Sequence, residues 1–360
     1  MHPSTKLLIG FVAASALILS ACSSSDTATS TTTLAPVTTL ATTTTVATAT
    51  TTVPPTTTTE PESDIPESIN GLEADEDLIN RRVVAIKIDN HPKARPQVVL
   101  NEADAVYETL VEGGLTRFIA LYQTKDFDKV GPNRSGRVTD ADLIKGLDAV
   151  FQISGAQGWV KNIYRKIDIN VLYDNGVSTF RDKSRPAPHN LFASTPKIRT
   201  IADENNWSNE NPGNMFLFGE APGSGDAATS ISMSFSDAPN ANWEWDGEVY
   251  LRSNGNTPHE TVNPEDDIEQ VSADVLVALR VREFIMKDPV SNGTSLPTAE
   301  TVGTGEAVIF YNGEVVEGTW SREEATDMFT LTNTDDTPMV IPPGRLWISL
   351  IPNEEPVTWE

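Results

Sequence analysis

Short runs of apolar and β-branched residues after about residue 80 predict strands separated by turns. Arg82–Asp89 is such a run and ends in the turn-forming sequence Asp-Asn-His-Pro. Ala105–Val111 and Thr116–Thr124 are two further runs, and the Gly-Gly pair between them predicts a hairpin. Ala149–Ile153 predicts a fourth strand.

Helical patterns alternate with these strands. Thr139 or Asp140 is expected to cap a helix that runs to about Gly146, and apolar residues at helical spacing predict another helix at Gln157–Lys166. A third helix is expected to begin at Ser194-Thr195-Pro196, with proline in its first turn. The alternation favours a mixed α/β region in which helices cover a sheet.

Beyond about Asn205 the pattern changes to strands and tight hairpins. The runs expected to form strands are Ser230–Ser236, Trp243–Trp245, Glu248–Arg252, Asp274–Ile285, Gly305–Tyr311, Glu314–Trp320, Met328–Thr332 and Arg345–Ile351. Asp-Gly and Asn-Gly pairs between neighbouring runs supply the positive φ angles that tight hairpins require. The predicted fold class is therefore α+β, a mixed α/β region followed by a mainly antiparallel β domain, either a sandwich or a barrel.

The first 21 residues form a predicted lipoprotein signal peptide. Leu7–Leu19 is an apolar run, too short for a permanent membrane span, and Leu-Ser-Ala-Cys closes it at Cys22. Cys22 is the only cysteine of the chain, which excludes a disulfide scaffold. The pattern predicts a diacylated Cys22 that holds the protein at the outer face of the bacterial cytoplasmic membrane, facing the cell wall.

Residues 22–64 read as a disordered tether rich in Thr, Pro and Ala. Threonine occupies 17 of the 30 positions from 31 to 60, and such a segment buries too little apolar surface to fold. The tether is therefore expected to give the folded part reach away from the membrane.

Charge divides the remainder of the chain. The chain has a net charge of −25, but this average conceals a basic region. Residues 81–200 contain 19 Lys and Arg and 13 Asp and Glu, whereas residues 201–360 contain 6 Lys and Arg and 29 Asp and Glu. We therefore expect a basic α/β domain at 65–204, a connecting segment at 205–229 and an acidic β domain at 230–360, with attraction between the two domains. An extracytoplasmic location argues against nucleic acid as a partner of the basic region.

Several motifs occur in one order along the chain. They are Ile88–Pro92, Ala94–Gln97, Ala103–Glu108, Val111–Gly114, Thr116–Phe118, Gly131–Pro132, Arg134–Arg137, Pro188–Leu191, Gly318–Trp320 and Pro343–Ile348. Together they resemble the amino- and carboxy-terminal domains of the YerB-like bacterial lipoproteins, and the resemblance covers nearly everything after the tether. These are domains of unknown function, so the resemblance implies architecture and location and no catalytic residue.

Polar residues on predicted loops at strand ends are the candidates for ligand contact. They are Asp89, Asn90, His91, Arg95, Gln97, Asp104, Glu108, Glu112, Arg117, Arg134, Arg137, Arg181, His189 and Asn190. Arginine binds phosphate or carboxylate in a bidentate manner, and Arg134 and Arg137 are spaced to converge on one anion. Alternatively, Arg117, Arg134 and Arg137 pair with Asp104, Glu108 and Glu112 and merely hold loops.

Other chemistry has weaker support in the sequence. His91 and His189 with Asp89 or Glu108 are compatible with a metal or acid/base cluster, but neither histidine has metal-ligand spacing, and both are expected to order turns. Ser135 and Ser154 lack the context of a nucleophile, and Gly113-Gly114 is no phosphate loop. No metal and no cofactor are predicted.

Two features of the β region admit alternative interpretations. Acidic runs at 265–267 and 335–336 favour solvated loops over calcium sites. Tryptophans on the predicted strands are either core residues or platforms for sugar rings, with core favoured; they are Trp243, Trp245, Trp320 and Trp347.

The sequence is compatible with two hypotheses about function. The first is a non-enzymatic, lipid-anchored envelope module whose arginine-rich loops bind an anionic wall polymer, lipid phosphate, muropeptide or partner protein. The second is an envelope enzyme acting on phosphorylated glycopolymer or peptidoglycan, with Asp89, Glu108 or Glu112 as the base and arginines stabilising phosphoryl charge.

Overall fold

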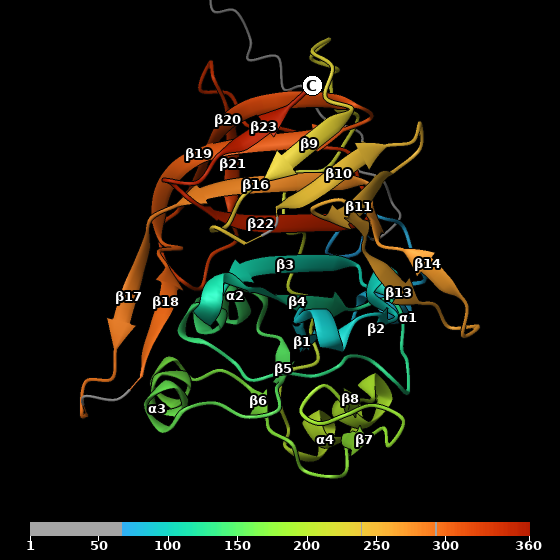
Figure 1. Ribbon diagram of the computed structural model, residues 1–360, viewed down its shortest axis with the longest axis vertical. Coiled ribbons are helices and arrows are strands. Elements are labelled where there is room, and N and C mark those ends of the chain that lie inside the picture. The colour runs from blue at the N-terminus through green and yellow to red at the C-terminus, as the bar shows by residue number, and fades with distance from the viewer. Residues whose placement is uncertain (1–66, 239, 292–293) are drawn as a thin grey trace, which may run out of the picture. The chain divides into compact units, whose positions relative to one another are not determined.

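A computed structural model describes residues 67–238, 240–291 and 294–360 (Figure 1). The predicted signal peptide, Cys22 and the tether lie outside the described residues. All described residues lie within one compact unit, Pro61–Glu360. Among their helices, none has both the length and the apolar character needed to cross a membrane.

The central element is a ten-stranded mixed sheet with the order β21-β20-β19-β16-β22-β3-β4-β1-β5-β6. Its strands are β1 Val84–Asp89, β3 Ala105–Leu110, β4 Thr116–Tyr122, β5 Val150–Gln152, β6 Val171–Leu172, β16 Val275–Val281, β19 Gly303–Tyr311, β20 Glu314–Arg322, β21 Thr330–Asn333 and β22 Leu346–Pro352. Figure 1 shows the middle of this sheet as a stack from β16 down to β5.

Strands from the basic and the acidic regions join in this one sheet. β22 runs parallel to β3, with Leu346 opposite Ala105 and Ser349 opposite Glu108. The residue boundaries of the two domains stay a prediction, but backbone hydrogen bonds make the two regions neighbours in a single sheet.

Strand β1 is buried along its whole length because both faces of the sheet are covered. On one face, Ala85 belongs to a core that includes Ile144 of α2 and Val160 of α3. On the other face, Ile86 belongs to a core that includes Ile198 of α4. These helices are α2 Val138–Leu147, α3 Gly158–Ile167 and α4 Thr195–Glu204.

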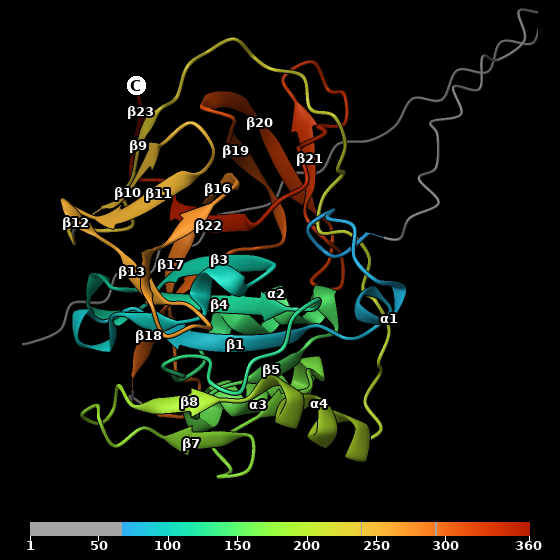
Figure 2. The same ribbon diagram turned by 90° about the vertical axis from the view of Figure 1, so that its right-hand side faces the viewer.

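A second sheet packs on the face of the main sheet that α4 also covers (Figure 2). It has the order β12-β11-β10-β9-β23, with β15 beside β11. Its strands are β9 Ser230–Met233, β10 Ala241–Trp245, β11 Tyr250–Asn254, β12 Thr257–Pro258, β15 Ser272–Ala273 and β23 Val357–Trp359. Trp243 of this sheet contacts Trp347 of the main sheet edge to face, with ring centroids 5.1 Å apart. The two sheets therefore pack as in a sandwich.

Smaller elements complete the fold. A three-stranded sheet joins β2 Gln97–Val98, β13 Glu260–Val262 and β14 Ile268–Gln270, and two hairpins pair β7 Thr179–Arg181 with β8 Leu191–Ala193 and β17 Glu283–Lys287 with β18 Ser295–Ala299. The short helices are α1 Glu76–Ile79, η1 Pro92–Ala94, η2 Leu100–Glu102 and η3 Glu112–Gly114.

The predicted α+β class is confirmed, while two local predictions are wrong. Helix α2 begins at Val138, and Asp140 lies inside its first turn, where its carboxylate accepts a 2.7 Å hydrogen bond from the Arg137 N–H. The run Asp274–Ile285 is not one strand, because the chain leaves the main sheet after Val281 and enters the β17–β18 hairpin.

Candidate functional site

Asp89, at the carboxyl end of β1, is the centre of a polar cluster at the edge of the core. Its Oδ2 lies 2.8 Å from Nδ1 of His189 and 3.2 Å from Nε of Arg134, and its Oδ1 accepts the His91 N–H. Asp89 is only 3% exposed and His189 only 7%, so their contact is shielded from solvent. Asp89 therefore both orders the turn after β1 and orients groups from two other loops.

Two histidine rings stack beside this carboxylate. The rings of His91 and His189 lie 4.7 Å apart and are nearly parallel, at 19°. Nδ1 of His91 accepts a hydrogen bond from the Lys93 N–H, so the proton of the neutral ring is on Nε2. Desolvation and the neighbouring His189 lower the pKa of His91, which favours this neutral form.

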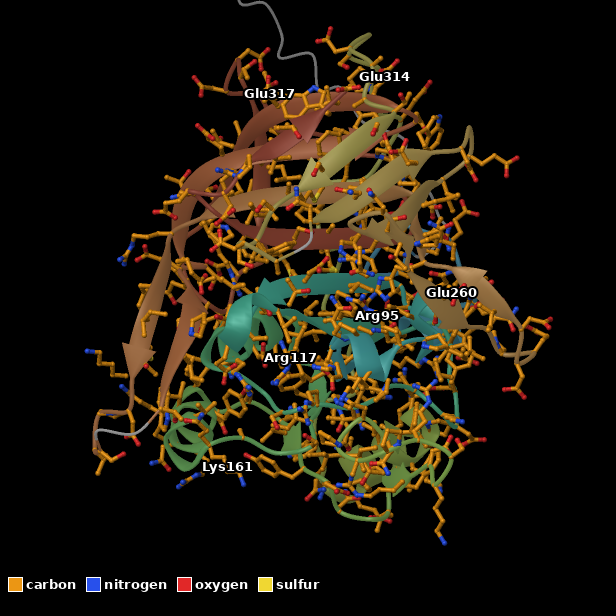
Figure 3. All side chains as sticks on the ribbon, in the orientation of Figure 1. Arg95, Arg117, Lys161, Glu260, Glu314 and Glu317 are labelled. Atoms are coloured by element: carbon orange, nitrogen blue, oxygen red, sulfur yellow. The ribbon has the colours of Figure 1, made fainter. Side chains whose placement is uncertain are left out.

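Three arginines, Arg117, Arg134 and Arg137, gather around the loop that carries Ser135; we call them the arginine cluster. Arg117 and Arg137 both donate from Nη1 to the carbonyl oxygen of Ser135, at 2.7 and 3.3 Å. Arg134 approaches Asp89 through Nε, and its two terminal nitrogens have no hydrogen-bond partner among the described residues. In Figure 3 Arg117 is labelled near the middle of the molecule, among many side-chain nitrogens, whereas Glu314 and Glu317 are labelled at the top.

The cluster contains more positive than negative charge. Burial, followed by repulsion from Arg137, lowers the pKa of Arg117 to about 10. Glu112 accepts a 2.6 Å hydrogen bond from Nε of Arg137. Its partial burial acts to raise the pKa of Glu112, but the hydrogen bond and charge of Arg137 outweigh burial and leave this pKa lowered.

A buried ion pair lies next to the arginine cluster. Nζ of Lys87 is 2.6 Å from Oδ1 of Asp140, and both side chains are fully buried. Burial lowers the pKa of Lys87 to about 8, although Asp140 acts in the opposite direction. Asp140 also accepts a hydrogen bond from the Arg137 N–H, so this ion pair fixes the start of α2 next to Arg137.

Other predicted residues form a second polar centre between the two sheets. Glu108 is fully buried and accepts hydrogen bonds from Thr116, Arg252 and Trp347, at 2.6 to 2.8 Å. Arg252, which is 1% exposed, lies over the rings of Phe118, Trp243 and Trp347. This ion pair joins the two regions of the chain.

Arg95, Asn90 and Gln97 extend this second centre. Arg95 donates to both the side-chain and backbone oxygens of Asn90 and to Oδ1 of Asn254, and Asn90 donates to Thr116. Gln97 donates to the carbonyl of Asp89 and accepts from Nε2 of His259, so it connects the two polar centres.

The remaining predicted residues lie apart from both centres. Asp104 accepts from the N–H groups of Gln123 and Thr124 and holds that turn. Arg181 donates to Asn190 and to Asp174 on the half-exposed β7–β8 hairpin.

Sequence reasoning missed Arg252, His259 and Asn254. Their signal was weak but present: Arg252 is one of six basic residues after position 200, and His259 is one of only four histidines. Arg252 was passed over because it ends a predicted strand and strand residues were assigned to the core, while Asn254 and His259 belong to no motif.

The described residues include those named for metal, nucleophile and sugar-binding chemistry. No group of three metal-ligating side chains is arranged to hold an ion in the described part of the chain. The hydroxyls of Ser135 and Ser154 lie 3.2 Å apart and contact each other. Trp243, Trp320 and Trp347 are buried in the core, and Trp245 is half-buried.

The geometry combines two chemical capacities. Partly exposed guanidinium groups with unused donors can bind an anion. His189 has its Nδ1 on a carboxylate, which leaves Nε2 able to exchange a proton.

Comparison with known protein families gives two matches. Residues 69–208 match the model described as "Protein of unknown function (DUF3048) N-terminal domain", and residues 231–348 match the corresponding C-terminal domain. Together these models cover more than half of the chain.

The chain is also similar to a protein of Bacillus subtilis (strain 168) named "Putative lipoprotein YerB". The two are 28% identical over 301 residues, which cover 79% of this chain and 86% of that protein. The crystal structure of the YerB protein from Bacillus subtilis superposes with a TM-score of 0.69 at 23% identity, covering 81% of this chain and 98% of the other. The fold is therefore shared.

Proposed function

The chain belongs to the DUF3048 family of YerB-like lipoproteins, and on this premise we propose that it is an envelope-binding module anchored to the outer face of the cytoplasmic membrane. In this proposal, Cys22 carries the lipid and the arginine cluster binds an anionic component of the cell envelope.

The anchoring part rests on the lipobox at Cys22 and on the relative's description as a lipoprotein. The tether 22–64 would span about 35 Å as a flexible coil and about 130 Å when extended. The folded part can then reach wall polymers away from the membrane surface.

The observation that carries the binding proposal is the unused donor capacity of the arginine cluster. The side chain of Arg117 donates only to the carbonyl of Ser135, which it shares with Arg137, and the terminal nitrogens of Arg134 find no partner among the described residues. These sites suit the oxygens of a phosphate or carboxylate.

The charge balance supports the same conclusion. Four cationic groups, Lys87 and the arginine cluster, face three carboxylates, those of Asp89, Glu112 and Asp140. One positive charge is therefore left over, and an anion would counter the burial and the repulsion from Arg137 that together lower the pKa of Arg117.

Co-sedimentation of the full-length protein with purified cell-wall fragments tests this proposal. We expect Arg134→Ala and Arg117→Gln each to weaken binding about tenfold, equivalent to about 1.4 kcal/mol, and higher salt to weaken wild-type binding. Fragments stripped of phosphate-containing polymers distinguish a phosphate ligand from a carboxylate ligand.

Arg181→Ala is the matched control, because Arg181 pairs with Asp174 outside the cluster. Equal binding by wild type, the cluster variants and this control would refute the proposal.

A second candidate function is hydrolysis of an envelope polymer, favoured by the contact between Asp89 and His189. A carboxylate on Nδ1 fixes the tautomer that leaves Nε2 free to accept a proton from a hydroxyl or water. If this function is correct, muropeptide or phosphorylated polymer should be cleaved by wild type and not by His189→Gln. No cleavage by wild type under conditions where it binds would eliminate the enzyme.

A further inference from the structure

A small open pocket lies between the two regions of the chain, beside Asn90, and no residue of the arginine cluster lines it. Its volume is about 90 Å³. The basic region contributes Asn90, Arg95 and Thr116 to its wall, and the acidic region contributes Phe235, Arg252 and Asn254. In Figure 3 the label of Arg95 marks this part of the molecule.

Buried hydrogen-bond donors without partners occur in residues that line this pocket. Oδ1 of Asn254 accepts from Nη2 of Arg95 and from Nη1 of Arg252, both at 2.9 Å. Two arginine donors can face only the oxygen of the amide, so Nδ2 of Asn254 is a donor, and it has no partner among the described residues. Nε of Arg252, a residue only 1% exposed, also lacks one.

Acceptors on the wall are already occupied. Glu108 accepts from Thr116 and Arg252 on one oxygen and from Trp347 on the other. Oδ1 of Asn90 accepts twice from Arg95. A ligand therefore meets the spare Nη1 donor of Arg95, a partly buried side chain whose hydrogen bonds to the described residues use only Nε and Nη2, while the unpartnered donors of Asn254 and Arg252 lie buried behind it.

The charges around the pocket leave room for one negative charge. Arg95 and Arg252 carry two positive charges, and Glu108 supplies one negative charge. Burial, followed by repulsion from Arg252, lowers the pKa of Arg95 to about 10. A singly charged anion would neutralise the site, whereas a phosphate dianion would exceed its charge.

The rest of the wall is apolar. Pro92, Leu115, Phe235 and Ala241 line the pocket next to these donors. A carboxylate that carries a small apolar substituent on the adjacent atom matches both the arginines and the apolar part of this small pocket.

We propose that this pocket binds the free carboxylate end of a peptide whose last residue is small and apolar, such as alanine. Arg95 contacts the carboxylate, Arg252 adds its charge from behind, Asn254 holds the two arginines together, and Leu115 and Phe235 contact the side chain. The site is separate from the arginine cluster and does not depend on the function proposed above.

Calorimetric titration of the full-length protein with N-acetyl-alanyl-alanine tests the proposal. The free acid is expected to bind at least tenfold more tightly than the same peptide with an amide at its carboxyl end. The D,D and L,L forms distinguish two sources of the ligand, since preference for D,D indicates wall peptides and preference for L,L indicates protein carboxyl termini. Equal affinity for acid and amide, or no binding of the acid at millimolar concentration, would overturn the proposal.

Asn254→Asp provides a variant that is expected to keep its fold. The new carboxylate would lie between Arg95 and Arg252 and occupy the site with an internal anion, so peptide binding should fall at least tenfold without loss of thermal stability. Arg95→Gln should weaken binding as well, and Arg134→Ala should leave it unchanged. Undiminished binding by both pocket variants would contradict the assignment.

Discussion

His189 Nδ1 lies 2.8 Å from Asp89 Oδ2, although one hundred positions separate the two residues in the chain. Asp89 ends a central strand, and His189 belongs to the loop before β8. The contact therefore ties a peripheral hairpin to the centre of the sheet, next to the arginine cluster.

Asp89→Asn is expected to lower the free energy of unfolding by about 2–3 kcal/mol. The substitution removes the negative charge that Arg134 and His189 face in a nearly solvent-free position, while it preserves size. Urea denaturation at pH 7 measures the change. Asp182→Asn serves as the control, because its partner Lys129 is exposed and such a pair contributes less than about 1 kcal/mol. Equal losses in the two variants would contradict a special role for Asp89.

Much of the fold follows from local pattern. Arg82–Asp89 is apolar along its length because β1 is covered on both faces, and the hairpin after Ala105–Val111 follows from its glycines. The pairing of β22 with β3 could not be predicted, since the two strands lie more than two hundred residues apart and their registers depend on tertiary packing. Strands of two or three residues, such as β2 and β6, are too short to show a period.

Lys87→Met is expected to destabilise the protein by about 3–5 kcal/mol, because it leaves the buried carboxylate of Asp140 without its cation. The double variant Lys87→Met/Asp140→Asn should recover a large part of this loss. The asparagine keeps an oxygen for the Arg137 N–H and carries no charge. Urea denaturation of the two single variants and the double variant gives the coupling energy, and simple additivity would show that the pair acts as two independent groups.

Glu283→Gln is expected to stabilise the protein at alkaline pH. Burial, followed by repulsion from Glu354, raises the pKa of Glu283 to about 7, and Oε1 of Glu283 has no partner among the described residues. The carboxyl group of Glu283 holds its proton more tightly in the folded state than in the unfolded state. The stability that this protonation contributes is therefore lost as pH rises from about 4.5 to 7.

The variant should therefore match wild type at pH 4 and exceed its free energy of unfolding by about 1 kcal/mol at pH 8, a value reduced for partial exposure. Thermal unfolding across this range measures the difference. Glu300→Gln should show no such gain, since that carboxylate already pairs with Arg282. A constant difference at all pH values would refute titration of Glu283 as the cause.

Gly114→Ala is expected to cost more than Gly113→Ala. Both glycines have positive φ, 74° at Gly113 and 70° at Gly114, so either alanine introduces about 1 kcal/mol of backbone strain. A Cβ at Gly114 would lie 2.8 Å from Oγ of Ser236, whereas a Cβ at Gly113 would meet nothing within 4 Å. The difference in thermal midpoint between the two variants isolates the contact between the β3–β4 turn and the β domain. Equal midpoints would show that Ser236 moves aside without cost.

Charge arithmetic singled out the basic region but misjudged a buried ion pair. Arg117 and Arg137 of the basic region both donate to the carbonyl of Ser135, and the convergence of Arg134 and Arg137 on one anion stays a prediction. Among the described residues, however, the ion pair that joins the two regions has its arginine in the acidic region and its carboxylate, Glu108, in the basic one. Net charge describes a whole surface, while a buried pair depends on which two side chains the sheets bring together.

His259 connects that buried pair to acid sensitivity. It is fully buried, its Nδ1 accepts from Nη1 of Arg252 at 2.7 Å, and its Nε2 donates to Oε1 of Gln97 at 2.8 Å. Burial, followed by repulsion from Arg252 and Arg95, lowers the pKa of His259 well below its usual value. In the unfolded chain His259 therefore binds a proton near pH 6.5, whereas in the folded chain it stays neutral. Stability consequently falls as pH falls below about 6.5.

His259→Gln removes the titrating imidazole, while the oxygen of the glutamine amide can still accept a hydrogen bond from Arg252. Between pH 6.5 and 5, wild type should lose up to about 2 kcal/mol more stability than the variant, the limit for one histidine that does not titrate in the folded state. Urea denaturation at pH 7.5, 6.5 and 5 measures both slopes. The more exposed His91→Gln should change the slope less, because its ring is only partly shielded. Parallel slopes for wild type and His259→Gln would mean that another group takes up the proton, and the hydrogen bond from Arg252 would then have no part in acid unfolding.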